Sequence, residues 1–447
     1  MKRILIKGAT TVNEGITAVR DIFIKEGRIH AIGSGLSGKN ADQVIDGEGL
    51  FLLPGMIDDQ VHFRQPGLTH KGTIASESRA AVAGGITSFL DMPNTVPPTT
   101  SIQALTEKYH MAEGTAFSNY GFYFGAANDN IEAIKSLDPE MTCGLKVFMG
   151  ASTGNLLVDN PDALEQIFIH SPVLVAVHCE DTPTIDAAIS HFKRIYGSDI
   201  PISLHPLIRS EAACFKSTSL AVELAKKHKT RLHVLHLSTE KELSLFSEKP
   251  LNEKHITAEV CAHHLFFSDK DYKDRGTLIK CNPAIKTEKD RFSLLTALKD
   301  GKIDVVGTDH APHTLEEKQK PYLGAPSGLP LVQHALVCLL EHVHNGILSL
   351  ETLVERMAHA PAQLLGIRER GYLREGYWAD LVLVDMHQPT FVDKNPIYYQ
   401  CGWTPFSGLT FRSKVAATLV SGHVAFLNGK LDPSPAGRRL VFDPKTT

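Results

Sequence analysis

The stretch PGMIDDQVHFRQPG, residues 54–67, begins with a short apolar run and ends in charged and polar side chains. Side chains two residues apart on a β-strand point to the same face, so Gln60, His62 and Arg64 would share one face. Histidines at positions 60 and 62 would form a metal-binding pair, but position 60 holds glutamine. The stretch predicts a β-strand. Three interpretations of its end are open: a metal site with one ligand exchanged, a damaged metal site, or no metal site.

Seven further segments of this kind follow along the chain, each a short apolar run rich in Val, Ile or Phe. Most of them lie about 25–35 residues apart, which is the length of a strand–helix unit. Continuous apolar strands indicate a parallel sheet buried on both faces, and eight such units indicate a TIM-like (β/α)8 barrel. The eight predicted strands are 55–63, 85–94, 119–126, 143–150, 173–181, 231–239, 255–264 and 303–313.

Both ends of the chain have the alternating pattern of exposed β structure, within 4–53 and again at 376–386 and 414–429. Neither end has enough strands to be stable alone, so together they predict one small β-sandwich. The predicted division is a β-sandwich domain of residues 1–54 plus 368–447 and a barrel domain of residues 55–367.

The composition is that of an ordinary globular enzyme, with 447 residues, 43% of them hydrophobic and 21% charged. A net charge of −4 without a dense basic block argues against nucleic acid or an anionic membrane as the main partner. We see no signal peptide and no apolar run near the roughly 18 residues of a membrane span. The seven cysteines contain no C-x-x-C pair, which fits reduced thiols. We expect a cytoplasmic enzyme with a small-molecule substrate, and we leave a homo-oligomer open.

Polar side chains collect where the predicted strands end, and the active site of a (β/α)8 barrel lies at those ends. A single histidine there is usually a structural hydrogen-bonding group, and a single aspartate is often a helix N-cap. Coincidence at the first, fourth, fifth, sixth and eighth strand ends, five of the eight, favours a functional site instead, and the second strand adds Asn94. The residues are Gln60, His62 and Arg64 on the first strand, Asn94 on the second, Lys146 on the fourth, His178 on the fifth, His236 on the sixth, and Asp309 and His313 on the eighth.

Lys146 lies between apolar neighbours in GLKVFMG. On a surface its stem would pack and its ammonium group would reach water, but the interior of a barrel offers no nearby surface. Burial favours the neutral amine, which can react with CO₂ to give a carbamate, an anionic oxygen ligand.

Histidine nitrogens combined with hard anionic oxygens suit Zn²⁺ or a similar first-row divalent ion. Two ions bridged by one anionic oxygen pair would need about six protein ligands. Five are predicted, namely His62, Lys146, His178, His236 and Asp309, and Gln60 falls on the sixth position.

Nine segments together resemble the dihydroorotases of the amidohydrolase superfamily over essentially the full length of the chain. Hydantoinases and allantoinases are the alternatives within that superfamily. The segments are LPGMIDDQVHFRQPGLTHKG (53–72), GGITSFLDMPNT (84–95), GLKVFMGAST (144–153), VAVHCED (175–181), HVLHLST (233–239), TAEVCAHHL (257–265), KCNPAIKTEKDR (280–291), VGTDHAPH (306–313) and GYWADLVLVD (376–385).

The resemblance implies reversible cyclisation of N-carbamoyl-L-aspartate to L-dihydroorotate with loss of water, the ring-closing step of pyrimidine synthesis. It also implies a metal site in which His62 and Asp309 bind the more exposed ion, while His178 and His236 bind the buried one. Lys146, carboxylated on its side-chain nitrogen, would bridge the two ions, as in the members that use a lysine there.

The same resemblance makes Asp309 the general base and acid. It implies that Arg64, Asn94, Asn282 and His313 bind the substrate. Taken alone, Arg64 could be a surface ion pair and Asn94 a turn residue. An arginine, an amide and a histidine around one pocket nevertheless fit a carboxylate better than a neutral ring, which favours dihydroorotase over hydantoinase.

Gln60 is the departure from the family pattern, although some bacterial members have a similar DDQVHF segment. An amide oxygen is a weaker zinc donor than imidazole. The sequence therefore allows either one or two bound ions. Gln60 is also the only feature that favours a non-catalytic scaffold. His263 and His264 are interpreted as structural, and the Gly/Pro-rich segment 314–330 is predicted to fold over the substrate.

Overall fold

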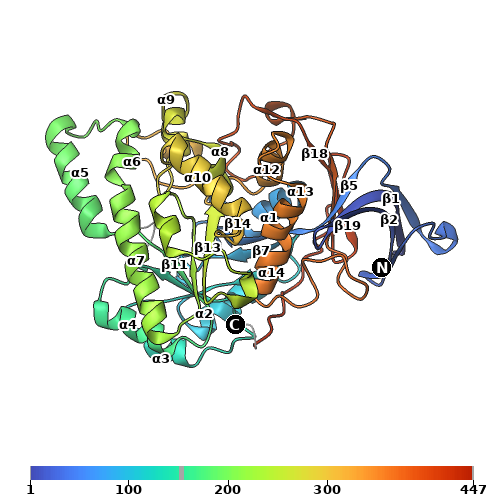
Figure 1. Ribbon diagram of the computed structural model, residues 1–447, viewed down its shortest axis with the longest axis horizontal. Helices are drawn as coiled ribbons and strands as arrows, with labels where there is room; N and C mark the ends of the chain where they lie inside the picture. The colour runs from blue at the N-terminus through green and yellow to red at the C-terminus, as the bar shows by residue number, and fades with distance from the viewer. Residues whose placement is uncertain (1, 151–155, 445–447) are drawn as a thin grey trace.

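The chain forms a parallel barrel and a second, largely antiparallel sheet, which lie side by side in Figure 1. This computed structural model describes residues 2–150 and 156–444. The last three residues of the segment GLKVFMGAST therefore lie outside the described residues. None of the described helices combines the length and the apolar character needed to cross a bilayer.

All eight predicted barrel strands are present and pair in parallel, so the (β/α)8 prediction is confirmed. The third is split at Tyr123 into two short strands. The ring closes where Val61 and His310 form a parallel bridge and the His62 amide donates to the His310 carbonyl at 2.7 Å. The strands are β6 (Met56–Val61), β7 (Ile86–Asp91), β8 (Asn119–Phe122), β9 (Phe124–Gly125), β10 (Leu145–Phe148), β11 (Val175–His178), β12 (Leu232–Val234), β13 (Ile256–Cys261) and β14 (Val305–Gly307).

Helices surround the strands (Figure 1), and the nearly complete burial of the strands follows from this cover. Thr73 and Thr287 begin two of these helices with capping boxes, which satisfy backbone amides that have no helical partner. The helices are α1 (Ile74–Ala83), α2 (Ile102–Ala112), α3 (Ile131–Lys135), α4 (Pro161–His170), α5 (Thr182–Tyr196), α6 (His205–Ile208), α7 (Glu211–His228), α8 (Ala262–Phe266), α9 (Tyr272–Arg275), α10 (Glu288–Lys299), α11 (Leu315–Lys318), α12 (Ala335–His344), α13 (Leu350–Val354) and α14 (Ala360–Leu364).

Strands from both ends of the chain share the second sheet, as predicted for the sandwich. Antiparallel pairing of Leu52 with Leu383 joins the two halves, and residues such as Ile6, Ile22 and Leu419 form a core of their own. The strands are β1 (Ile4–Asn13), β2 (Ile16–Lys25), β3 (Arg28–Gly33), β4 (Gln43–Asp46), β5 (Phe51–Pro54), β15 (Leu381–Asp385), β18 (Lys414–Val420), β19 (His423–Leu427) and β20 (Lys430–Leu431).

Two segments of the C-terminal part contact the barrel. The segment that carries β16 (Thr390–Phe391) and β17 (Thr410–Phe411) also contains Trp403, whose indole N–H donates to the His313 carbonyl at 2.7 Å. Near the C-terminus, the Leu440 amide donates to the Tyr120 carbonyl at 2.9 Å. The division at 54/55 and 367/368 separates the two main sheets and stays a prediction.

Candidate active site

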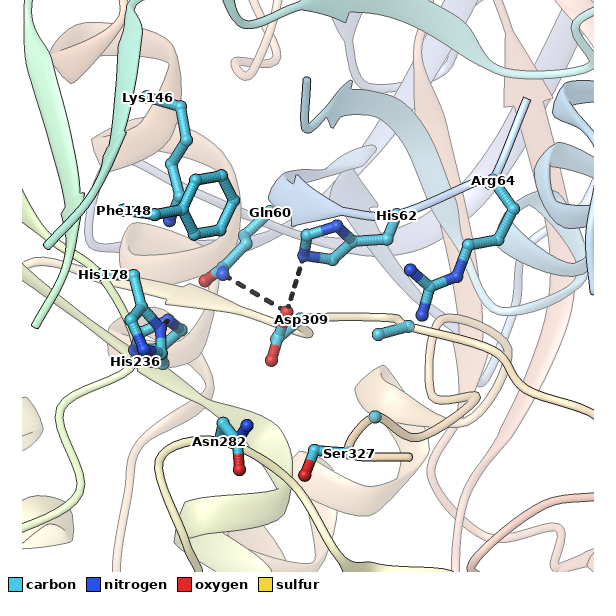
Figure 2. A pocket seen from close by; sticks show the side chains of 12 residues that line it. Gln60, His62, Arg64, Lys146, Phe148, His178, His236, Asn282, Asp309 and Ser327 are labelled. Atoms are coloured by element: carbon cyan, nitrogen blue, oxygen red, sulfur yellow. Dashed lines mark hydrogen bonds and ion pairs between the residues drawn. The ribbon is translucent and has the colours of Figure 1, made fainter. Parts of the chain in front are cut away.

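A cavity lies among the carboxyl ends of the barrel strands, and Figure 2 shows the side chains that line it. The five predicted metal ligands line it, as do the predicted substrate-binding residues Arg64 and Asn282. Asn94 and His313 lie behind this lining, in contact with His62 and Arg64. The lining residues are Gln60, His62, Arg64, Lys146, Phe148, His178, His236, Asn282, Asp309, Ala311, Ser327 and Gly328.

Three residues of the cavity have left-handed backbone although none is glycine. The φ angles are +69° at Arg64, +42° at His236 and +49° at Asp309. Such conformations cost on the order of 1–3 kcal/mol each and persist only where surrounding contacts impose them. All three residues follow the end of a barrel strand. The turn at each strand end thus directs a predicted site residue into the cavity.

The two ring nitrogens of His62 have different partners. Nδ1 lies 2.7 Å from the side-chain oxygen of Asn94, which can only accept, so Nδ1 carries the proton. The unprotonated Nε2 lies 3.1 Å from Oδ1 of Asp309 (Figure 2). A nitrogen lone pair opposite a carboxylate oxygen is repulsive unless a proton or a cation lies between them. Asn94 thus fixes the orientation of the His62 ring. The ligand role of His62 and the contact of Asn94 with substrate stay predictions.

Gln60 points to the same carboxylate. Its amide nitrogen donates to Oδ1 of Asp309 at 3.3 Å (Figure 2), and its amide oxygen lies 4.0 Å from the thiol of Cys261. Gln60 is therefore a neighbour of Asp309 and supplies a donor to it.

His178 and His236 face each other across the deeper part of the cavity. Nδ1 of His178 lies 3.1 Å from Nε2 of His236, and Nε2 of His178 lies 3.2 Å from the Glu180 carboxylate. Burial opposes ionisation of Glu180, but Arg209 and His178 together lower its pKa to about 2. The anionic Glu180 therefore favours the proton on Nε2 of His178 and leaves Nδ1 free to bind a metal. Burial also lowers the pKa of both histidines, which keeps them neutral.

Lys146 is buried and its amine has no hydrogen-bond partner among the described residues. The nitrogen lies 4.7 Å from the centre of the Phe148 ring. Burial lowers the pKa of Lys146 to about 8, although Asp309 and Glu259 oppose that shift. About a tenth of the amine is therefore neutral at pH 7, and carbamate formation uses this neutral form.

Arg64 is a buried cation at the cavity wall. Its Nε donates to the Pro312 carbonyl at 3.0 Å, and one terminal nitrogen lies 3.0 Å from Nε2 of His313. Lys71 contacts the other nitrogen of that ring at 3.0 Å. Burial lowers the pKa of Arg64 to about 10, which still leaves the guanidinium charged at neutral pH. These contacts fix a positive charge beside the predicted metal ligands.

Segment 314–330 reaches the cavity through Ser327 and Gly328. The buried ammonium group of Lys318 donates to the carbonyls of Lys280, Pro326 and Gly328, each at 2.9 Å. The contact of this segment with the site agrees with the predicted cover, and its closure over a substrate stays a prediction.

Sequence reasoning missed Glu180, Ser327 and Gly328. Glu180 had a usable signal, because it lies two residues after His178 in VAVHCED. Ser327 and Gly328 belong to segment 314–330, which is predicted to cover the site, but the composition of the segment does not indicate which of its residues reach the cavity. The structural interpretation of His264 agrees with its hydrogen bond to the Pro283 carbonyl at 3.0 Å.

Comparisons with known proteins agree with this geometry. Residues 51–425 match the model of the amidohydrolase family. The chain is 37% identical to the dihydroorotase of Halobacterium salinarum over 399 residues, which cover 87% of this chain and 89% of that protein. It is 33% identical to the dihydroorotase of Methanothermobacter thermautotrophicus over 421 residues, 94% of this chain and 92% of that protein.

Among solved structures, the fold is similar to the L-hydantoinase (dihydropyrimidinase) of Arthrobacter aurescens. The TM-score is 0.93 at 28% identity, and the match covers 99% of this chain and 100% of that chain. The dihydropyrimidinase of Brevibacillus agri matches with a TM-score of 0.89 at 26% identity, covering 99% of each chain. By its fold, its strand-end residues and these matches, the chain belongs to the amidohydrolase family and, within it, to the dihydroorotase group.

Proposed function

We propose that the chain is a dihydroorotase, a cyclic amide hydrolase that interconverts N-carbamoyl-L-aspartate and L-dihydroorotate. The observation that carries this proposal is the fixed cation of Arg64 in the cavity of the predicted metal ligands. Dihydroorotate has a carboxylate outside its reacting ring, whereas hydantoin and dihydrouracil have none. A guanidinium group binds a carboxylate with two parallel hydrogen bonds.

The residues of the cavity fit one or two divalent metal ions, and we propose Zn²⁺. The nitrogens of His178 and His236 lie 3.1 Å apart, as do Nε2 of His62 and Oδ1 of Asp309. Ligand atoms on a tetrahedral zinc ion with bonds of about 2.0–2.1 Å lie about 3.3 Å apart. The amine of Lys146, without a partner among the described residues, would become the bridging carbamate.

When bound, a divalent ion would polarise the amide carbonyl and make water a stronger nucleophile. Asp309 takes the proton from the attacking water in ring opening and returns it to the leaving ring nitrogen. Its neighbour Gln60 donates a hydrogen bond to the carboxylate and so holds it in place for both transfers. Ring closure uses the same steps in reverse order.

Arg64 holds the substrate carboxylate during these steps. Asn282 also lines the cavity, and its side-chain oxygen has no hydrogen-bond partner among the described residues. That oxygen is available to accept from a ring N–H of the substrate. Two polar contacts at different edges of the ring would fix the reacting carbonyl relative to Asp309.

The test is an assay of purified, zinc-supplied protein with L-dihydroorotate, N-carbamoyl-L-aspartate, hydantoin and dihydrouracil. We expect turnover of the first two in opposite directions, and loss of that turnover in Asp309→Asn. Hydrolysis of hydantoin or dihydrouracil in place of dihydroorotate would overturn the substrate assignment. Absence of any turnover in metal-loaded protein would support the scaffold alternative.

All seven cysteines are free, which supports a cytoplasmic location.

A further inference from the structure

A second group of buried metal-ligating side chains lies within the barrel, outside the cavity described above. It consists of Asp59 of β6, His233 of β12 and Glu259 of β13, all fully buried. One ligating atom from each lies within 4.8 Å of the others. We propose that these three residues bind a further divalent cation of the zinc class, separate from the active-site metal and independent of the proposed function.

The tautomer of His233 follows from its contacts. Nδ1 lies 2.8 Å from the hydroxyl oxygen of Thr257, and that hydroxyl donates to the Leu232 carbonyl at 3.1 Å. A carbonyl can only accept, so the single hydroxyl proton goes to Leu232 and Nδ1–H of His233 donates to the hydroxyl oxygen. Nε2 is then unprotonated, and it lies 3.3 Å from Oδ2 of Asp59. A hydrogen-bonded far nitrogen is the usual arrangement of a metal-binding histidine.

The two carboxylates leave ligand atoms without partners. Neither oxygen of Asp59, nor Oε2 of Glu259, accepts a hydrogen bond from any described residue. Oε1 of Glu259 is held by the Cys261 thiol at 3.2 Å and by the His236 amide at 3.3 Å. Buried carboxylates without hydrogen bonds require a cation or a proton. Two carboxylates and one imidazole form a ligand set typical of zinc and similar ions.

The backbone around the group brings the three side chains together. In β6, Asp58 pairs with Phe89 and Val61 with Asp91, so β6 has one residue more than β7 between these pairs. A bulge of this kind re-aims a side chain, which explains why Asp59 and Gln60 both reach the barrel interior. A Cβ at Gly307 would lie 2.8 Å from Oδ1 of Asp59, so a larger residue there would displace this carboxylate.

The 3.3 Å between His233 Nε2 and Asp59 Oδ2 equals the separation of about 3.3 Å expected for two ligand atoms on tetrahedral zinc.

The neighbouring carboxylate of Asp58 is different, because the Thr308 hydroxyl and amide donate to its two oxygens at 2.6 and 3.0 Å. Asp58 therefore needs no ion and serves as a matched control.

The experiment measures bound zinc per chain in a background that lacks the active-site ligands, His178→Asn/His236→Asn/Asp309→Asn. After addition of Zn²⁺ and dialysis, we expect one zinc ion per chain in this background by elemental analysis. Adding Asp59→Asn should remove it, whereas adding Asp58→Asn should leave it. A background protein without zinc would overturn the proposal in favour of a shared proton, and zinc that survives Asp59→Asn would overturn it by placing the ion elsewhere.

Unmodified protein gives a second measurement that does not depend on the folding of variants. Crystals grown with Zn²⁺ and measured at the zinc absorption edge should give an anomalous peak between Asp59, His233 and Glu259. Peaks at His178 and His236 without a peak at this group would contradict the proposal. The readout is metal occupancy, so it is independent of whether the protein converts dihydroorotate.

Discussion

Replacing Arg64 with glutamine would remove the cation that, in the proposed function, holds the carboxylate of dihydroorotate. The Pro312 carbonyl accepts from Nε at 3.0 Å, and one terminal nitrogen lies 3.0 Å from Nε2 of His313, so the remaining N–H groups of the two terminal nitrogens are those available to a substrate. Glutamine is neutral and cannot form the two parallel charged hydrogen bonds. The change should therefore lower kcat/KM for dihydroorotate much more than for a ring without a carboxylate.

The expected size follows from the two hydrogen bonds that glutamine cannot form. A hydrogen bond to a charged group contributes about 1.5–3 kcal/mol, so two of them contribute about 3–6 kcal/mol. Since each 1.4 kcal/mol is about a factor of ten, kcat/KM for dihydroorotate should fall by about 10²–10⁴. Loss of the anchor to Pro312 would affect every substrate alike, so the ratio of the two substrates isolates the carboxylate contact.

The assay compares kcat/KM for dihydroorotate and dihydrouracil in the unmodified protein, Arg64→Gln and Arg64→Lys. The lysine variant keeps the charge but not the planar fork, so its loss for dihydroorotate should be intermediate. Equal losses for both substrates in Arg64→Gln would refute the reasoning and make Arg64 a structural support of His313.

Three further outcomes are expected. Gln60→His should lower the zinc dissociation constant at least about tenfold, because imidazole is a stronger zinc donor than an amide. Competition with a chelator measures this constant, and an unchanged value would place residue 60 away from the ion. Burial lowers the pKa of Lys146 to about 8, so the amine is protonated and unreactive below that pH. At a fixed concentration of dissolved CO₂, reactivation of metal-free, decarboxylated protein by zinc should therefore speed up about tenfold per unit of rising pH below pH 8 and level off above it, and a flat profile from pH 6 to 9 under that condition would contradict this. Lys318→Met should reduce the free energy of unfolding by about 3 kcal/mol or more, because three buried carbonyls lose their donor; the exposed Lys320→Met is the control, and equal denaturant midpoints would exclude the effect.

The barrel could be predicted because its strands are buried on both faces. A run such as residues 173–177 is apolar along its whole length, and β11 overlaps it. The residues after each run then mark the site, as His178 shows. The residues at which each strand begins and ends could not be predicted from the sequence. Strands such as β12 are only three residues long, and hydrogen bonding between strands decides where they end.

Side-chain direction at irregular positions could not be predicted. Alternation places Asp59 and Gln60 on opposite faces, and only the extra residue in β6 brings both inward. The meeting of Asp59 with His233 and Glu259 depends on that bulge and on three distant strands. In the same way, the hydrogen bond from His62 to Asn94 depends on how two strand-end loops approach each other.

The pairing of β5 with β15 has a consequence for the order in which the chain is made. Leu52 leaves the ribosome long before its partner Leu383, and the whole barrel lies between them. At about 5–20 residues per second, the roughly 330 intervening residues take about 15–65 s to synthesise. During that interval the N-terminal strands have an unpaired edge at β5, open to other chains. Completion of this sheet is therefore a late event of biosynthesis, and the barrel can form before it.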